Sequence, residues 1–216
     1  MKALIIDTET TGLPKSRNAS IQDNNNWPYI VQIAWILFDF DEHKIISFQN
    51  HIIKLRNNMK IPEESTKIHR ITNERMEKEG KDISVVFDKF IKSFNNCQYI
   101  VAHNLDFDWN ILSVEFYRNK LFHMIDLNKN KKIRYCTMKH AKKLYRFRNK
   151  NGKLTKKYPK LIDLYKLLFH EEPKNLHDAS VDTYACFRCF HKMIAGNDFK
   201  TGGGIPPLPP FKGGGL

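Results

Sequence analysis

Short apolar runs separated by polar breaks fill the first half of the chain, and this pattern predicts several strands. Residues 3–6 form an apolar run typical of a buried strand. Strand patterns also lie at 29–40 and 44–53, and the order of the three predicts a meander. A fourth apolar run at 99–102 predicts another buried strand. The polar, Asn-rich segment 14–28 is expected to be a loop.

Helical spacing of apolar residues becomes frequent in the second half of the chain. Five helices are predicted, at 83–94, from about Phe107 onward, at 137–147, at 160–169 and at 178–195. Asp108 falls in the first turn of the second of these helices, and Gly196 is a stop signal after the last. Strands followed by alternating helices favour an α/β sheet with helices packed on it.

The length of the chain suits one domain with a substantial core, at 216 residues. We assign residues 1–198 to this domain and 199–216 to a flexible Gly/Pro-rich tail. From Thr201 the tail reads TGGGIPPLPPFKGGGL, which predicts a short polyproline II stretch between flexible ends. Such a tail could dock into a partner's aromatic groove, or bind a sliding clamp through Leu208 and Phe211. We favour the alternative that the tail is idle or non-native.

Composition excludes a membrane protein and a disulfide scaffold. Hydrophobic residues make up 41% of the chain, but no run reaches the roughly 18–20 apolar residues of a transmembrane helix. The first strand begins so early that we expect no signal peptide. The four cysteines form no disulfide framework. Cys186 and Cys189 are expected on a buried helix face rather than at a zinc ion, and the chain in a reducing cytoplasm.

Positive charge is concentrated in one stretch. The net charge is +13, and residues 129–160 contain fourteen Lys or Arg and no Asp or Glu. Aromatic residues are interleaved with these bases, which favours contact with a nucleic-acid backbone and some base stacking. The candidates for this contact are Lys139, Lys142, Lys143, Arg146 and Arg148. A solvated basic face, or a loop that offsets an acidic site, is the alternative.

Four carboxylates in three separated segments carry the candidate chemistry. Asp7 and Glu9 continue the first strand, and residues i and i+2 of a strand point to one face. Asp108 and Asp182 come from two helices. Buried acids are costly unless cations neutralise them, and hard oxygen ligands favour Mg²⁺ or Mn²⁺. Two such ions, about 4 Å apart, can clamp an in-line displacement at phosphorus.

His177 lies just before the last predicted helix, or at its start, and five residues before Asp182. A neutral imidazole there can accept a proton from an attacking water. Taken singly, the Asp7 segment is more typical of a solvated strand end, and the His177 segment of a helix start with a surface acid. Their conjunction favours a catalytic metal site. Asp106 is then interpreted as an N-cap, and Asp178 as a first-turn acid favoured by the helix dipole.

The three motifs resemble those of the DEDDh (DnaQ-like) family of 3′–5′ exonucleases, the group of the proofreading epsilon subunit of bacterial DNA polymerase III. DTETTGL matches the first motif as it stands; HNLDFD and HDASVD match HNAxFD and HxAxxD. The segment 61–72 resembles one that usually ends HGIT. Leu105 stands where a small residue is usual, and Arg70 where glycine is usual. The likeness covers roughly residues 1–195.

This resemblance implies a ribonuclease H-like fold with a central mixed β-sheet flanked by helices. It implies that Asp7, Glu9, Asp108 and Asp182 hold two divalent metal ions, Mg²⁺ or Mn²⁺, and that His177 is the general base. The terminal nucleotide would be held at the substrate-binding positions Thr10, Thr11, Gly12, Leu13, His103 and Asn104. The product would be a nucleoside 5′-monophosphate.

Several roles stay open at this point. The substrate would be the single-stranded or frayed 3′ end of DNA, in proofreading with a DNA polymerase as partner, in repair or in degradation. An RNA-processing exonuclease is the alternative of the same class. The alternative of another class is a nucleic-acid-binding adaptor that acts through residues 129–160 and the proline-rich tail.

Overall fold

The computed structural model describes residues 1–148, 151–173 and 176–199. Residues 200–216 of the predicted tail 199–216 lie outside these residues, and the boundary between 198 and 199 stays a prediction. Phe199, the last residue described, packs its ring 5.2 Å from that of Phe38. No helix within the described ranges is long and apolar enough to cross a membrane.

A five-stranded mixed sheet forms the centre of the molecule, in the order β3-β2-β1-β4-β5. Its strands are β1 (Lys2–Thr10), β2 (Ile30–Asp39), β3 (Lys44–Ile52), β4 (Tyr99–Ala102) and β5 (Ile133–Cys136). The first three form the predicted antiparallel meander. β4 pairs parallel with β1, and β5 pairs parallel with β4. The sheet confirms the predicted mixed α/β architecture.

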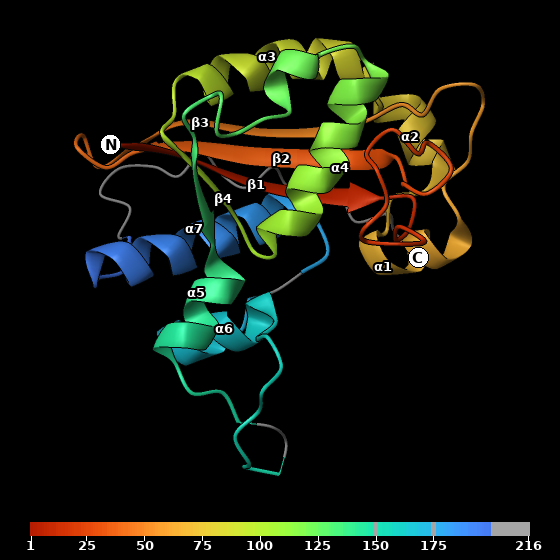
Figure 1. The fold of residues 1–216 in the computed structure, drawn as a ribbon. Helices are drawn as coiled ribbons and strands as arrows, with labels where there is room; N and C mark the ends of the chain where they lie inside the picture. The colour runs from red at the N-terminus through yellow and green to blue at the C-terminus, as the bar shows by residue number, and fades with distance from the viewer. Residues whose placement is uncertain (149–150, 174–175, 200–216) are drawn as a thin grey trace.

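Helices cover both faces of this sheet (Figure 1). They are α1 (Glu63–His69), α2 (Asn73–Glu79), α3 (Ile83–Asn95), α4 (Leu105–Arg118), α5 (Thr137–Leu144), α6 (Leu161–Phe169) and α7 (Ala179–Ala195), with a 3-10 turn at Phe122–Met124. α3 and α4 lie on one face and α7 on the other, while α5 and α6 pack beside α7. α1 and α2 lie at the end of the sheet where β1 finishes.

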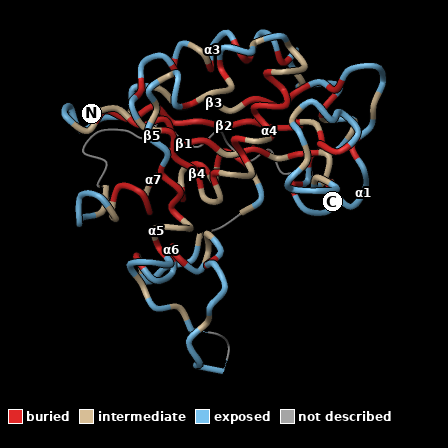
Figure 2. Tube along the Cα trace, viewed as in Figure 1, coloured by how far each residue is buried: buried red, intermediate tan, exposed pale blue. Residues whose placement is uncertain are grey.

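Alternation along β1 distributes its side chains between the two helical layers. Leu4 and Ile6 belong to the cluster under α3 and α4, whereas Ala3 and Ile5 belong to the cluster under α7. Buried residues concentrate along the sheet and the inner helix faces (Figure 2). Each methylene buried there contributes about 0.8 kcal/mol, so this two-sided core provides the rigid support of the strand ends.

Four features of the fold differ from the predicted elements. β5 was not predicted, nor were the short helices α1 and α2. The helix predicted at 137–147 ends at Leu144, because Tyr145 adopts an extended conformation with φ −124° and ψ 153°. The four cysteines are free and buried, as expected, and Cys186 and Cys189 lie on the inner face of α7.

Candidate active site

The acids of β1 face α7. Asp7 and Glu9 continue the row of Ala3 and Ile5, which packs under that helix. Asp182 lies in the first turn of α7. One potential ligand atom each of Glu9, His177 and Asp182 lies within 4.8 Å of the other two. The tertiary fold therefore gathers two of the three sequence motifs at the end of β1.

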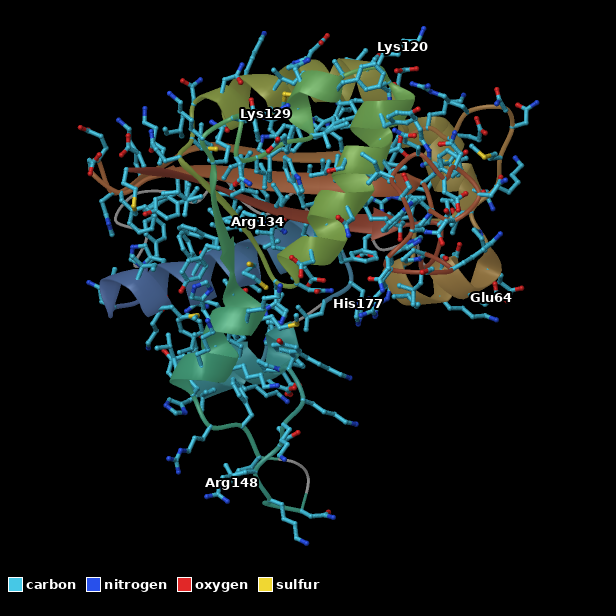
Figure 3. The ribbon with its side chains drawn as sticks, viewed as in Figure 1. Glu64, Lys120, Lys129, Arg134, Arg148 and His177 are labelled. Carbon is cyan, nitrogen blue, oxygen red and sulfur yellow. The ribbon has the colours of Figure 1, made fainter. Side chains whose placement is uncertain are left out.

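His177 enters this cluster through a turn just before α7. Its φ is 70°, in the left-handed region that non-glycine residues seldom adopt. Its backbone N–H donates to Oδ2 of Asp182 at 3.1 Å, which fixes the turn against the helix. The side chain is exposed, and Figure 3 labels it below the sheet, beside α1. An imidazole held there can exchange protons with solvent.

Asp108 reaches the site from the first turn of α4, where it is buried. Its Oδ1 accepts hydrogen bonds from the backbone N–H of Thr8 at 3.1 Å and from the Thr8 hydroxyl at 2.9 Å. Because Thr8 lies between Asp7 and Glu9 on the strand, its side chain points to the opposite face, toward α4. One strand thus presents two acids to α7 and holds a third from α4. Sequence analysis missed Thr8, whose position between the two acids was the available signal.

The carboxylates of the site are held in an environment that disfavours their charge. Burial is the largest cause, followed by the neighbouring acids: it raises the pKa of Asp7 well above its usual range and that of Glu9 to about 8. Burial likewise raises the pKa of Asp108 and of Asp182 to about 7. A cluster of this kind is neutralised either by protons or by cations.

The donor set fits divalent cations. Oδ1 of Asp182 is buried and has no hydrogen-bond partner in the described part of the chain. An unpaired buried carboxylate oxygen is costly, and a cation would satisfy it. The acids Asp7, Glu9, Asp108 and Asp182 supply hard oxygen ligands of the kind that Mg²⁺ and Mn²⁺ prefer.

The segment after β1 forms the rim of the site. The hydroxyl of Thr10 donates to the carbonyl of Gly12 at 2.6 Å. Gly12 has φ 152°, a conformation that other residues rarely adopt. Thr11 exchanges two hydrogen bonds with Tyr29, at 2.9 and 3.0 Å. Leu13 is 74% exposed, so its side chain is free to contact a ligand.

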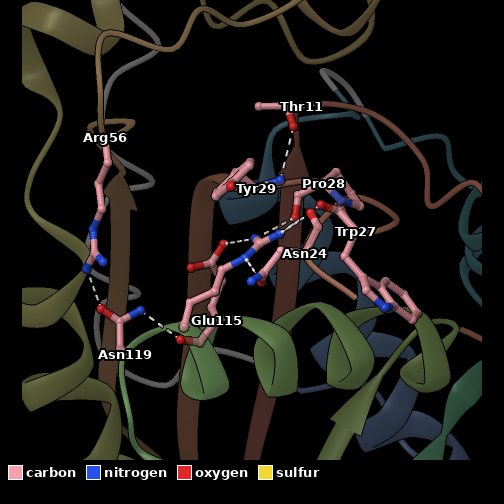
Figure 4. A network of polar contacts seen from close by, with 9 residues as sticks. Thr11, Asn24, Trp27, Pro28, Tyr29, Arg56, Glu115 and Asn119 are labelled. Atoms are coloured by element: carbon pink, nitrogen blue, oxygen red, sulfur yellow. Dashed lines mark hydrogen bonds and ion pairs between the residues drawn. The ribbon is translucent and has the colours of Figure 1, made fainter. Parts of the chain in front are cut away.

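Arg118, at the end of α4, clamps the loop that follows this rim (Figure 4). Its guanidinium donates to the carbonyls of Pro28 at 3.0 Å and Trp27 at 2.8 Å, and lies 3.8 Å from the centre of the Tyr29 ring. Glu115 pairs with it at 2.6 Å, and both side chains are buried. Because Tyr29 is also hydrogen-bonded to Thr11, the Arg118–Glu115 pair connects α4 to the rim. Sequence analysis did not find this pair.

His103 follows β4 at the same end of the sheet. Its ring nitrogens contact the Thr137 hydroxyl at 3.0 Å and the Pro159 carbonyl at 3.1 Å. Burial lowers the pKa of His103 to about 4, so the ring is neutral. Asn104 has φ 82° and begins α4. Substrate contact by His103 and Asn104 stays a prediction.

The roles predicted for Asp106 and Asp178 are wrong. Asp106 lies inside the first turn of α4 and forms ion pairs with Arg134 and Lys139, because Asn104 already occupies the N-cap position. Asp178 is itself an N-cap, since its carboxylate accepts from the Ser180 N–H at 2.9 Å. The backbone conformation at each helix start decides which residue takes the N-cap position, and only the fold shows that this is Asn104 for α4 and Asp178 for α7.

The predicted backbone-binding residues differ in their surroundings. Lys139 is paired with Asp106. Lys142 lies 4.2 Å above the ring of Tyr158. Lys143, Arg146 and Arg148 are exposed. Lys129, Lys131 and Lys142 are exposed as well, so exposed positive charge occurs from the beginning of the basic stretch to beyond α5.

Comparison with known proteins identifies the relatives of this chain. Residues 4–190 match the RNase T exonuclease family. The DNA polymerase III subunit epsilon of Buchnera aphidicola subsp. Acyrthosiphon pisum is 27% identical over 205 residues, which cover 91% of this chain and 74% of that protein.

Solved structures of exonuclease I share the fold. The E. coli enzyme in complex with a dT13 oligonucleotide has a TM-score of 0.68 and 20% identity, over 88% of this chain and 41% of that one. The enzyme from Methylocaldum szegediense has a TM-score of 0.67 and 17% identity, over 92% and 42%. The chain thus spans about two fifths of the exonuclease I chains. With the match over residues 4–190, the chain belongs to the RNase T exonuclease family, the DnaQ-like 3′–5′ exonucleases that its motifs resemble.

Proposed function

We propose that this protein removes nucleotides from single-stranded or frayed 3′ ends of DNA, with two divalent cations, and releases nucleoside 5′-monophosphates. The observation that carries the proposal is the approach of Glu9, His177 and Asp182 to within 4.8 Å of one another. Asp7 and Asp108 belong to the same acidic cluster, because Glu9 and Asp108 raise the pKa of Asp7 and Asp108 also raises that of Glu9. The family match supports the same chemistry.

The acids and the histidine of the site have different roles in the reaction. Asp7, Glu9, Asp108 and Asp182 would hold Mg²⁺ or Mn²⁺, which when bound lower the pKa of water and offset negative charge at the scissile phosphate. His177 accepts the proton of the attacking water, whose oxygen forms the new bond to phosphorus. The bond from phosphorus to the 3′-oxygen of the preceding nucleotide breaks, and that oxygen takes a proton from solvent. The released nucleotide keeps its 5′-phosphate.

The rim would hold the terminal nucleotide during this step. Backbone groups of Thr10 to Gly12 and the exposed side chain of Leu13 are available to it. Fixing the 3′ end relative to His177 converts the attack into an effectively unimolecular event. Thr8 contributes indirectly, because it orients the Asp108 carboxylate.

A time course on 5′-labelled DNA and RNA of matched sequence, with Mg²⁺, Mn²⁺ or EDTA, tests the proposal. We expect a ladder that shortens from the 3′ end on DNA and disappears in EDTA. His177→Ala should slow it about 10²–10⁴-fold while DNA binding is retained, because only proton transfer is removed. His123→Ala, which changes another exposed histidine, is the matched control. Metal-dependent cleavage that His177→Ala leaves unchanged would contradict the assigned base, and a ladder on RNA alone would contradict the substrate.

A DNA polymerase is the partner we propose for the exonuclease. The supporting observation is the 27% identity with a protein named as a subunit of DNA polymerase III. Affinity-tagged protein should retain a polymerase through a salt wash, and the retained complex should remove a mismatched 3′ nucleotide before extension. Recovery of the exonuclease without any polymerase activity would point to a stand-alone enzyme.

A further inference from the structure

A basic arm projects from the body of the protein between α5 and α6 (Figure 1). We define it by residues 145–148 and 151–159. Arg148 bridges to Leu154 in antiparallel fashion, and the Thr155 N–H donates to the Phe147 carbonyl at 2.9 Å. The Arg148 guanidinium donates to the Gly152 carbonyl at 2.6 Å. The arm is therefore a short two-stranded structure rather than an unstructured excursion of the chain.

The charged side chains of the arm face solvent and have one sign. Arg146, Arg148, Lys156 and Lys157 are exposed, and the sequence has no acid between Asp126 and Asp163. Most of the arm is exposed in Figure 2, and Figure 3 shows Arg148 far from the helices. At its base, Tyr145 and Phe147 pack against the cluster of α6 and α7. The exposed positive side chains therefore lie on an arm whose base is packed against α6 and α7.

His103 connects this arm to the active site. One ring nitrogen contacts Thr137, the first residue of the helix that leads into the arm, and the other contacts Pro159, where the arm ends. His103 follows β4 and lies five residues before Asp108. His103 therefore contacts the last residue of the arm and the first residue of the helix that precedes it, at the end of the sheet that carries the acids.

We propose that the basic arm binds the phosphodiester backbone of the substrate strand several nucleotides away from the 3′ end. This inference rests on the proposed function, because the active site requires a polyanionic strand at the same end of the sheet. Pro159 lies seven positions after Gly152, and an extended chain of that length spans about 23 Å. At the ~3.4 Å axial rise per nucleotide of one strand in a duplex, this reach corresponds to roughly seven nucleotides, and it corresponds to fewer on a more extended single strand. His103 acts as a positioning residue that sets the direction of the arm.

Binding in EDTA tests the arm separately from hydrolysis. The arm variant combines four changes, Arg146→Ser, Arg148→Ser, Lys156→Ser and Lys157→Ser. Its control removes four exposed lysines elsewhere, by Lys44→Ser, Lys78→Ser, Lys89→Ser and Lys92→Ser. Fluorescence anisotropy with a labelled thymidine strand of about 20 nucleotides measures the dissociation constant at several salt concentrations. A thymidine trinucleotide is the short probe.

The arm variant should bind the long strand at least tenfold more weakly, and the slope of log K against log salt should become shallower by about 2.8. The arm variant should also lose much of its preference for the long strand over the trinucleotide. The control variant should keep both the affinity for the long strand and this preference. Arg146→Lys with Arg148→Lys should bind as the unchanged protein does, since charge is retained. Equal affinity and salt slope in the arm variant would overturn the proposal, as would equal losses in the lysine and serine variants.

The outcome for the arm is distinct from the outcome for the enzyme. Absence of hydrolysis by the unchanged protein would contradict the proposed function, and the length dependence of binding in EDTA would still be measured. If the enzyme is active but the four substitutions of the arm variant leave its affinity for the long strand unchanged, only the proposed role of the arm is contradicted.

Discussion

Arg70 ends α1 in a conformation that suits glycine better than any other residue. Its φ is 62°, and its backbone N–H caps the helix through the Thr66 carbonyl. Left-handed residues with a Cβ cost about 1–2 kcal/mol, so the glycine usual at this position in the resembled motif has a conformational reason. His177 and Asn104 adopt the same region beside the catalytic acids. Six further non-glycine residues of the described ranges also have positive φ, so this conformation is not confined to the site.

Arg70→Gly should raise the free energy of unfolding by about 0.5–1 kcal/mol, because the relief of strain exceeds the added entropy of the unfolded chain. Urea denaturation followed by circular dichroism measures the change. Arg70→Ala is the matched control, since it removes the same charge but keeps a Cβ at φ 62°. Equal stabilisation by both substitutions would assign the effect to charge instead.

At the scale of elements, α4 connects the core to two parts of the site. Its first turn holds Asp108 against Thr8, and its last turn carries Arg118 and Glu115 against the loop 14–28. Residues 14–28 were predicted to be a loop, and Tyr29, which follows it, exchanges hydrogen bonds with Thr11. The helix therefore holds Asp108 at one end and supports the segment around Thr11 at the other.

Arg118→Met should destabilise the protein by about 3–5 kcal/mol, because it leaves the Glu115 carboxylate buried without its partner. Burial already raises the pKa of Glu115 above its usual value, against the opposing effect of Arg118. Adding Glu115→Gln should recover most of the loss, as no buried charge remains. Chemical denaturation of the two variants provides the comparison.

The double variant should still bind a 3′ end more weakly, with KM raised more than kcat is lowered, because the carbonyls of Trp27 and Pro28 have lost their donor. Full recovery of both stability and KM in the double variant would show that Arg118 neutralises Glu115 and does not position the rim.

For the molecule as a whole, the acidic cluster sets the dependence of stability on pH. Glu9 keeps its proton to about pH 8, and Asp108 and Asp182 to about pH 7, whereas the unfolded chain releases these protons near pH 4. The metal-free folded state therefore binds more protons than the unfolded state between these values. Its free energy of unfolding falls as pH rises through this range.

Between pH 6.5 and 8 the metal-free protein should lose about 2 kcal/mol of stability. The buried histidines His51, His69 and His103 oppose part of this decline, because burial lowers their pKa values in the folded state while the unfolded chain still binds protons at these residues near pH 6.5. Mg²⁺ should restore more stability at pH 8 than at pH 6.5, since it replaces protons on the same oxygens. Denaturation in EDTA and in Mg²⁺ at both pH values measures these differences.

Asp182→Asn is the comparison for this experiment, because it removes one acid and should flatten the decline in EDTA. Metal-free stability that rises with pH in the unchanged protein would show that the acids are not protonated together in the folded state.

Local pattern alone determined much of this molecule. The apolar runs predicted β1, β2, β3 and β4 to within a residue or two, because a buried strand needs consecutive or alternating apolar positions. Long helices such as α3 and α7 were predicted for the same reason, with Gly196 ending α7 at φ 75°. The ordered motifs predicted the family, which the match over residues 4–190 confirms, while the metal-binding role of the acids stays a prediction.

Only the tertiary structure decided the remaining features. β5 is four residues long and carries Arg134, so its strand state depends on pairing with β4 rather than on its own pattern. α1 and α2, of seven residues each, are too short to be stable without packing. Thr8 and Asp108 are one hundred residues apart, and Arg118 contacts carbonyls about ninety residues away. Such contacts arise from the packing of whole elements, which no local pattern of side chains specifies.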